Sequence, residues 1–150
     1  MSTPGAFERG TDGPRVILVG VDGSPTSLRA AAYAAGLARR QRSKLVAVFV
    51  ATAAPSIAGW VPGAEQVAVD AAAEVDAELR QLKTRAAELG IDAEYRSVRG
   101  DPVAELSRIA DELPADAVLV GASEQAGHRL IGSIAVRLVR VGRWPVTVVP

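Results

Sequence analysis

Five short apolar segments, each separated from the next by a longer segment of helical pattern, constrain this chain more than any other feature. Most are rich in Val, Ile and Leu at every position, which is typical of parallel strands covered on both faces. The third alternates imperfectly and is expected nearer a sheet edge. The predicted strands cover residues 16–21, 45–50, 93–98, 117–120 and 146–149.

The segments between these strands carry helix signals. Ser24–Pro25 and Asp101–Pro102 each place a capping side chain before a proline that suits the first position of a helix. Apolar residues recur at helical spacing in the longest segment, which ends at Gly90. The four predicted helices cover residues 25–40, 64–89, 102–113 and 134–141, the last with Ser133 as its N-cap.

This alternation predicts a single doubly wound α/β domain, in which a five-stranded parallel sheet carries helices on both faces. At 150 residues the chain has the length of one domain. Residues 1–14 lack an apolar run and are expected to form a flexible tail before a domain of residues 15–150. Residues 51–63 are longer than most connections and form either a ligand-binding lid or a linker.

The composition excludes several classes of function. The 17 basic and 17 acidic side chains balance, so the overall charge favours neither nucleic acid nor an anionic membrane as a partner. Cysteine is absent, which excludes disulfides and thiolate metal sites. No apolar run approaches the ~18 residues of a membrane span. No secretory signal is recognisable, so a cytoplasmic protein is expected.

Two polar segments follow predicted strands at their carboxyl ends, where doubly wound sheets bind ligands. One is Asp22–Gly23–Ser24, and the other covers residues 121–132 and is rich in Gly and small side chains. Such a loop presents backbone N–H groups to a phosphate, and the next helix adds its positive N-terminal end. Glu124 places a carboxylate inside this loop, where it would oppose a phosphate.

Several short motifs, taken in order, resemble those of the universal stress protein family. They are the turn Val21–Asp22–Gly23–Ser24, the turn Gly100–Asp101–Pro102 followed by Glu105, the glycines of residues 121–132, and the closing run of residues 144–149. The resemblance covers about residues 15–150. The excess of Arg over Lys and the abundance of Ala are a bias of GC-rich coding, so an actinobacterial type of this family is expected.

The resemblance implies a Rossmann-like sheet order of 3-2-1-4-5 and a crevice for an adenine nucleotide between strands one and four. Nucleotide-binding members border the adenine with an Asp after strand one and a Val at the end of strand two, which match Asp22 and Val50. Their phosphates lie on a loop of the form Gly, two residues, Gly, nine residues, Gly-Ser. Gly121 matches the first glycine and Gly132–Ser133 match the final pair.

This chain departs from that loop pattern at the second glycine, where Glu124 stands. Only seven residues separate Glu124 from Gly132, in place of nine. A carboxylate ~4 Å from a phosphate costs ~1–4 kcal/mol, depending on the local dielectric. Mg²⁺ could offset this cost, and Gly127 could take the place of the lost glycine.

No catalytic constellation emerges from the sequence. His128 is the only histidine, and it either contacts a phosphate beside Arg129 or is an exposed loop residue. Arg129 is equally suited to pair with Glu124, which would close the loop on itself. Since no Walker-type phosphate loop is present, the protein is predicted not to be an enzyme, or to have at most residual ATPase activity.

The final strand, residues 146–149, is expected at a sheet edge because it is short and apolar and lies between Pro145 and Pro150. Exposed edges invite pairing with another chain, unless the flanking prolines protect them. The family resemblance implies a two-fold homodimer built through Val146–Val149.

Two hypotheses of function follow. The leading one is a non-catalytic stress-response dimer with a degenerate adenine-nucleotide crevice, acting through protein partners that the sequence does not identify. The alternative is a sensor that binds ATP with Mg²⁺, or another adenine nucleotide, and hydrolyses ATP slowly at most. Its binding residues would be Asp22, Val50, Gly121, Gly127, Gly132 and Ser133.

Overall fold

The computed structural model describes residues 13–51, 64–123 and 132–150. Strands and helices alternate there as predicted, and the predicted boundaries hold within one residue. The strands are β1 (Val16–Val21), β2 (Lys44–Ala51), β3 (Ala93–Arg99), β4 (Ala117–Gly121) and β5 (Val146–Val149). The helices are α1 (Pro25–Gln41), α2 (Ala64–Glu88), α3 (Pro102–Glu112) and α4 (Ser133–Val141). The expected tail up to residue 12 and the connection at 52–63 lie outside the described residues.

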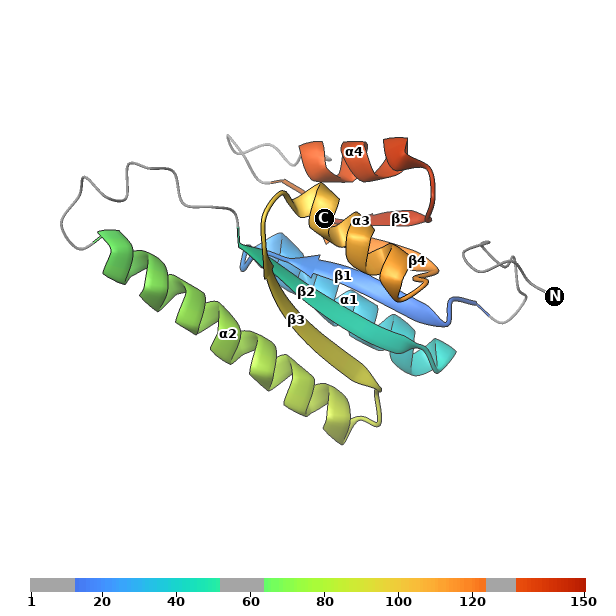
Figure 1. Ribbon diagram of the computed structural model, residues 1–150. Coiled ribbons are helices and arrows are strands. Elements are labelled where there is room, and N and C mark those ends of the chain that lie inside the picture. The colour runs from blue at the N-terminus through green and yellow to red at the C-terminus, as the bar shows by residue number, and fades with distance from the viewer. Residues whose placement is uncertain (1–12, 52–63, 124–131) are drawn as a thin grey trace.

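The strands form one parallel sheet in the order β3-β2-β1-β4-β5, which confirms the expected topology. Helices α1 and α2 cover one face and α3 and α4 the other, so the sheet is the middle of three layers (Figure 1). Successive strand residues point to opposite faces, so each face has its own core. Leu18 and Val118 are fully buried towards α3 and α4, and Ile17 and Leu119 towards α1 and α2.

The sheet divides at its carboxyl end, between β1 and β4. The pairing of these two strands ends at Val19 and Leu119. Beyond that point β1 continues beside β2 to Val21, and β4 continues beside β5 to Gly121. The helices that follow β1 and β4 lie on opposite faces of the sheet. This division, called the split below, is the topological switch point where doubly wound folds bind ligands.

Side-chain oxygens cap α1 and α3, as predicted. Ser24 accepts a hydrogen bond from the Ser27 N–H (3.2 Å), and Asp101 caps α3 in the same way (2.9 Å). The prediction that Ser133 caps α4 is wrong. Ser133 is the first helical residue, and Gly132 occupies the N-cap with a φ of 84° and no side-chain hydrogen bond. The positive φ of Gly132 turns the chain into the helix one residue earlier than the sequence pattern indicates.

Leu89 and Ala32 have the spacing of the apolar faces of the predicted helices, but both lie in solvent. Leu89 is 49% exposed because the chain turns at Gly90, and Ile91 is buried in its place. Ala32 is exposed because α1 contacts the sheet through Ala34 and the residues one turn away. Among the described residues, no helix is both long enough and apolar enough to cross a lipid bilayer.

Candidate functional site

The turn after β1 holds Asp22 at the opening of the split. A carboxylate oxygen of Asp22 accepts a hydrogen bond from the Ser24 N–H (2.9 Å), across Gly23 with its φ of 86°. Desolvation by neighbouring atoms raises the pKa of Asp22, but hydrogen bonds from Ser24 and Ser27 outweigh it and leave the pKa below its ordinary value. The side chain is exposed. The turn therefore presents an ionised carboxylate in a fixed position.

The first turn of α1 packs against the split on the face of the sheet that α1 and α2 cover. Thr26 is 1% exposed, and its hydroxyl donates a hydrogen bond to the Ala122 carbonyl (2.6 Å). Ser27 is also buried, and its hydroxyl donates to the Ser24 carbonyl (2.9 Å). Sequence reasoning missed both roles. The sequence signal that could have revealed them is the pair of hydroxyl residues, Thr26 and Ser27, at the start of an otherwise alanine-rich helix.

Gly121 ends β4 directly against this turn. A Cβ at position 121 would lie 2.5 Å from the backbone nitrogen of Ser27 and 2.5 Å from the carbonyl carbon of Thr26. Real Cβ atoms do not approach backbone so closely, and therefore only glycine lets α1 reach this position. The structure gives Gly121 a packing role that the sequence did not indicate. Its contact with a ligand stays a prediction.

Gly132 and Ser133 begin α4 next to the end of β4. A Cβ on Gly132 would lie 3.2 Å from the Cβ of Ser123, so the two ends of the connection between β4 and α4 meet there. Within the described residues, no side chain caps α4, and its first turn contains no acidic residue. The first N–H groups of α4, at the positive end of the helix dipole, therefore lack a capping side chain.

Val50 lies near the end of β2, the neighbour of β1. Its side chain is 8% exposed and packs in the core beneath α3 and α4, in register with Val98. This puts Val50 on the same face of the sheet as α4. The remaining loop residues singled out in the sequence lie outside the described residues: Glu124, Gly127, His128 and Arg129.

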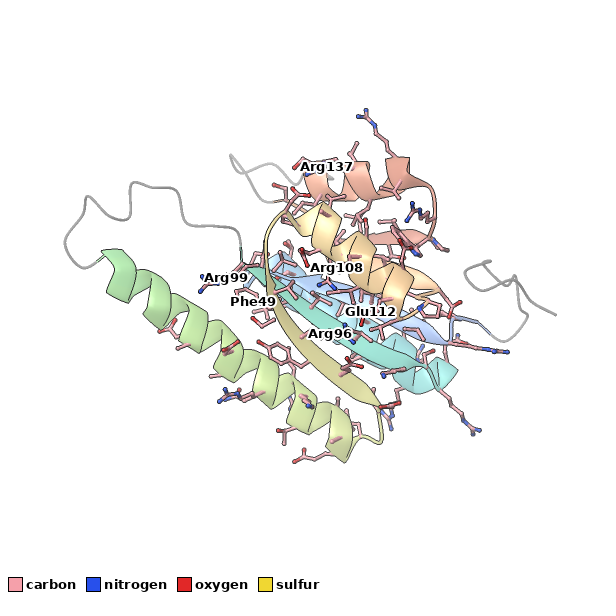
Figure 2. The ribbon with its side chains drawn as sticks, viewed as in Figure 1. Phe49, Arg96, Arg99, Arg108, Glu112 and Arg137 are labelled. Carbon is pink, nitrogen blue, oxygen red and sulfur yellow. The ribbon has the colours of Figure 1, made fainter. Side chains whose placement is uncertain are left out.

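Two ion pairs connect α4 and its C-terminal turn to α3. Arg137 donates two hydrogen bonds of 3.0 Å, one to each carboxylate oxygen of Asp101, and Figure 2 shows Arg137 between α4 and the start of α3. Arg143 pairs with Asp111 near the other end of α3. Both arginine side chains are exposed. Their pairing was missed because the partners lie 36 and 32 residues away in the chain.

The described residues offer binding groups without a reacting pair. A fixed carboxylate, helix N–H groups and small side chains surround the split. No histidine lies among the described residues, and none of their His, Cys, Asp and Glu side chains form a group of three or more that could hold a metal ion. This arrangement suits a polar ligand whose anionic group meets the start of α4.

The sheet order and the split define a Rossmann-like α/β domain with a ligand site at its switch point. The sequence profile of the universal stress protein family matches residues 14–150, and the chain belongs to this family. The actinobacterial type stays a prediction.

Known members resemble the chain over nearly its whole length. A universal stress protein of Mycobacterium tuberculosis is 31% identical over 140 residues, which are 90% of this chain and 95% of that protein. A crystal structure of a family member from Burkholderia pseudomallei is 29% identical, with a TM-score of 0.72 over 94% of this chain and 98% of that one. A universal stress protein solved in complex with cAMP is 31% identical, with a TM-score of 0.65 over 91% and 97%.

Proposed function

We propose that this protein is a non-catalytic regulatory member of the family that binds an adenine nucleotide with one phosphate, such as cyclic AMP or AMP, at the split. One observation carries the proposal. The start of α4, which no described side chain caps, lies next to the end of β4, across the split from the exposed carboxylate of Asp22. The structure of a relative in complex with cAMP, at 31% identity, supports this class of ligand.

Each predicted residue has a place in this proposal. Asp22 and Val50 would border the adenosine part, because they lie at the carboxyl ends of β1 and β2, the paired strands on one side of the split. Gly132 and Ser133 would hold the phosphate through the backbone N–H groups of α4. Gly121 would shape the site by admitting α1, and Gly127 would approach the phosphate if it replaces the lost glycine.

A single phosphate fits this chain better than a triphosphate. The first turn of α1 is already capped by Ser24, whereas none of the described side chains caps α4, the other helix beside the split. Glu124 and the shortened loop further oppose a long anionic chain. The alternative function, a sensor for ATP with Mg²⁺ that has slow ATP hydrolysis, requires Glu124 to be tolerated.

Calorimetric titration with cyclic AMP, AMP and Mg-ATP tests the proposal. We expect one of the monophosphates to bind and Mg-ATP to bind more weakly. At a hundredfold excess over Kd, the bound ligand should raise the stability by ~2.7 kcal/mol, visible as a thermal shift. Glu124→Gly should tighten binding of Mg-ATP more than that of cyclic AMP. Tighter binding of Mg-ATP than of either monophosphate by the unaltered protein would favour the alternative sensor.

The proposal includes a cytoplasmic homodimer formed through β5, which is one edge of the sheet. The carbonyls of Pro145 and Val149 both accept hydrogen bonds from the β4 side. Since strand residues alternate in direction, the N–H and C=O groups of Val146 and Val148 point to the free side of the edge. The outward-pointing groups of these two residues suit antiparallel pairing with a second copy.

The opposite edge, β3, carries features that discourage pairing. Glu94 and Arg96 lie on its α3-facing side, opposite Val46 and Val48 of β2 in the sheet register. Arg96 pairs with Glu94 (2.7 Å) and with Glu112 of α3 (3.1 Å), and Figure 2 shows Arg96 and Glu112 between β3 and α3. Charged side chains protect a strand edge from association. The β3 edge is therefore protected by charge, whereas the β5 edge has backbone groups free to pair, which favours a dimer through β5.

A further inference from the structure

Thr26 acts on a part of the chain remote in sequence. Its hydroxyl reaches the Ala122 carbonyl, 96 residues away, and bridges the split just beyond the last paired residues of β1 and β4. The side chain is 1% exposed, so it cannot itself touch a ligand. Helix capping does not explain the buried hydroxyl of Thr26 either, because the N-cap of α1 is Ser24.

Ala122 is a junction of three elements. Its carbonyl accepts from Thr26 of α1, and its N–H donates to the Val149 carbonyl at the end of β5 (2.8 Å). Both peptide groups of the first residue after β4 are therefore fixed. Gly121, immediately before it, is in close contact with the backbone of Thr26. The direction in which the chain leaves β4 towards Ser123 follows from these contacts.

We propose that Thr26 is a positioning residue of the ligand site, which sets the exit of the chain from β4 through its hydrogen bond to Ala122. Ser123 lies next to Gly132 at the start of α4, since a Cβ on Gly132 would lie 3.2 Å from that of Ser123. A shift at Ala122 would therefore move the phosphate-binding end relative to Asp22. The expected effect of Thr26 on ligand affinity rests on the function proposed above. Its effect on the backbone of residues 121–123 is independent of that function.

Three variants test this role. Thr26→Val keeps the shape of the side chain but leaves the Ala122 carbonyl without its donor, whereas Thr26→Ser keeps the hydroxyl. Ser43→Ala is a matched control, because Ser43 is a buried hydroxyl that donates to the Pro14 carbonyl at the opposite, amino end of the sheet. Affinities for cyclic AMP and AMP are measured by calorimetry, and backbone protection of residues 117–123 by hydrogen exchange.

We expect Thr26→Val to weaken nucleotide binding about tenfold, which corresponds to ~1.4 kcal/mol, and to speed exchange in residues 121–123. Thr26→Ser should restore both, and Ser43→Ala should change neither. If Thr26→Val is too unstable to purify, Thr26→Ala compared with Thr26→Ser isolates the hydroxyl equally well.

Two results would overturn the inference. One is an affinity and an exchange pattern in Thr26→Val that match the unaltered protein. The other is an equal loss in Thr26→Ser, which would assign the effect to the methyl group. If the unaltered protein binds neither nucleotide, the proposed function is wrong. The exchange rates of the ligand-free variants then decide by themselves whether Thr26 positions this segment.

Discussion

Replacing Gly121 by alanine adds a single methyl group but should strongly lower the free energy of unfolding of the ligand-free protein. The added Cβ would stand 2.5 Å from two backbone atoms and 2.8 Å from a third, the Thr26 oxygen. Ordinary carbon contacts are ~3.5–4.0 Å, so α1 and β4 would have to separate by about 1 Å. Backbone atoms cannot rotate aside as a flexible side chain can.

The magnitude follows from two contributions. Overpacking a well-filled site costs ~1–3 kcal/mol. Separating α1 from β4 also threatens the hydrogen bond between Thr26 and Ala122, whose net contribution is ~0.5–1.5 kcal/mol. Gly121→Ala should therefore lose ~2–4 kcal/mol, a large part of the ~5–15 kcal/mol that stabilises a typical domain. At ~2–4 °C per kcal/mol for a chain of this size, the Tm falls by ~4–16 °C.

Gly36→Ala is the matched control. Gly36 lies inside α1, is exposed, and a Cβ there would meet nothing within 4 Å. Alanine in an exposed helix interior is favoured over glycine by ~0.5–1 kcal/mol, so this variant should be more stable than the unaltered protein. Urea unfolding followed by circular dichroism measures both variants. A Gly121→Ala protein within ~0.5 kcal/mol of the original would refute the packing role assigned to Gly121.

Three further predictions rest on single contacts. The Arg137 guanidinium and the Ala104 N–H hold the pKa of Asp101 below its ordinary 3.8. The ionised Asp101 therefore contributes its full stability above pH 3.8, and this contribution is lost as the pH falls through the lower pKa of the folded state. Asp101→Asn, which retains a capping side chain, should therefore be less stable than the original at pH 7 in urea unfolding, with the gap narrowing as pH falls below 3.8; an equal gap at neutral and acidic pH contradicts this. Thr147→Asp, at an exposed position of β5, should yield monomers by light scattering while Thr147→Val does not; an unchanged mass contradicts the dimer. Leu138→Ala, fully buried on α4, should cost ~2–5 kcal/mol in the same unfolding assay; a loss under ~1 kcal/mol contradicts the burial of α4.

The strands and helices were predictable because each carries a local signal. Apolar runs such as residues 16–21 can be stable only when buried on both faces, and two proline-containing caps mark helix starts in the sequence itself. The sheet order was not a consequence of those signals and came from the family resemblance. Two of the errors, at Leu89 and Ser133, fall at helix ends, where burial and capping depend on the tertiary direction of the chain.

The turn and the loop of the candidate site were predictable from the sequence, but the long-range contacts that hold them in place were not. The sequence drew attention to Asp22 and Gly132 because turns and glycines stand out locally, and the family resemblance supplied the roles predicted for them. Sequence reasoning missed the bond from Thr26 to Ala122 and the ion pair between Asp101 and Arg137, which join segments 96 and 36 residues apart. Such contacts have no local signature, because each residue alone fits an ordinary helix.

The two outer glycines of the loop pattern are poor indicators of triphosphate binding in this chain. Gly121 is required by the approach of α1, and Gly132 by a φ of 84° beside Ser123. Both requirements hold without any ligand, so a domain that had lost ATP binding would still need both glycines. The chain departs from the family pattern within residues 124–131, which lie outside the described residues. The choice between a monophosphate and a triphosphate therefore depends on Glu124 and its neighbours, and Glu124→Gly is the substitution that separates the two.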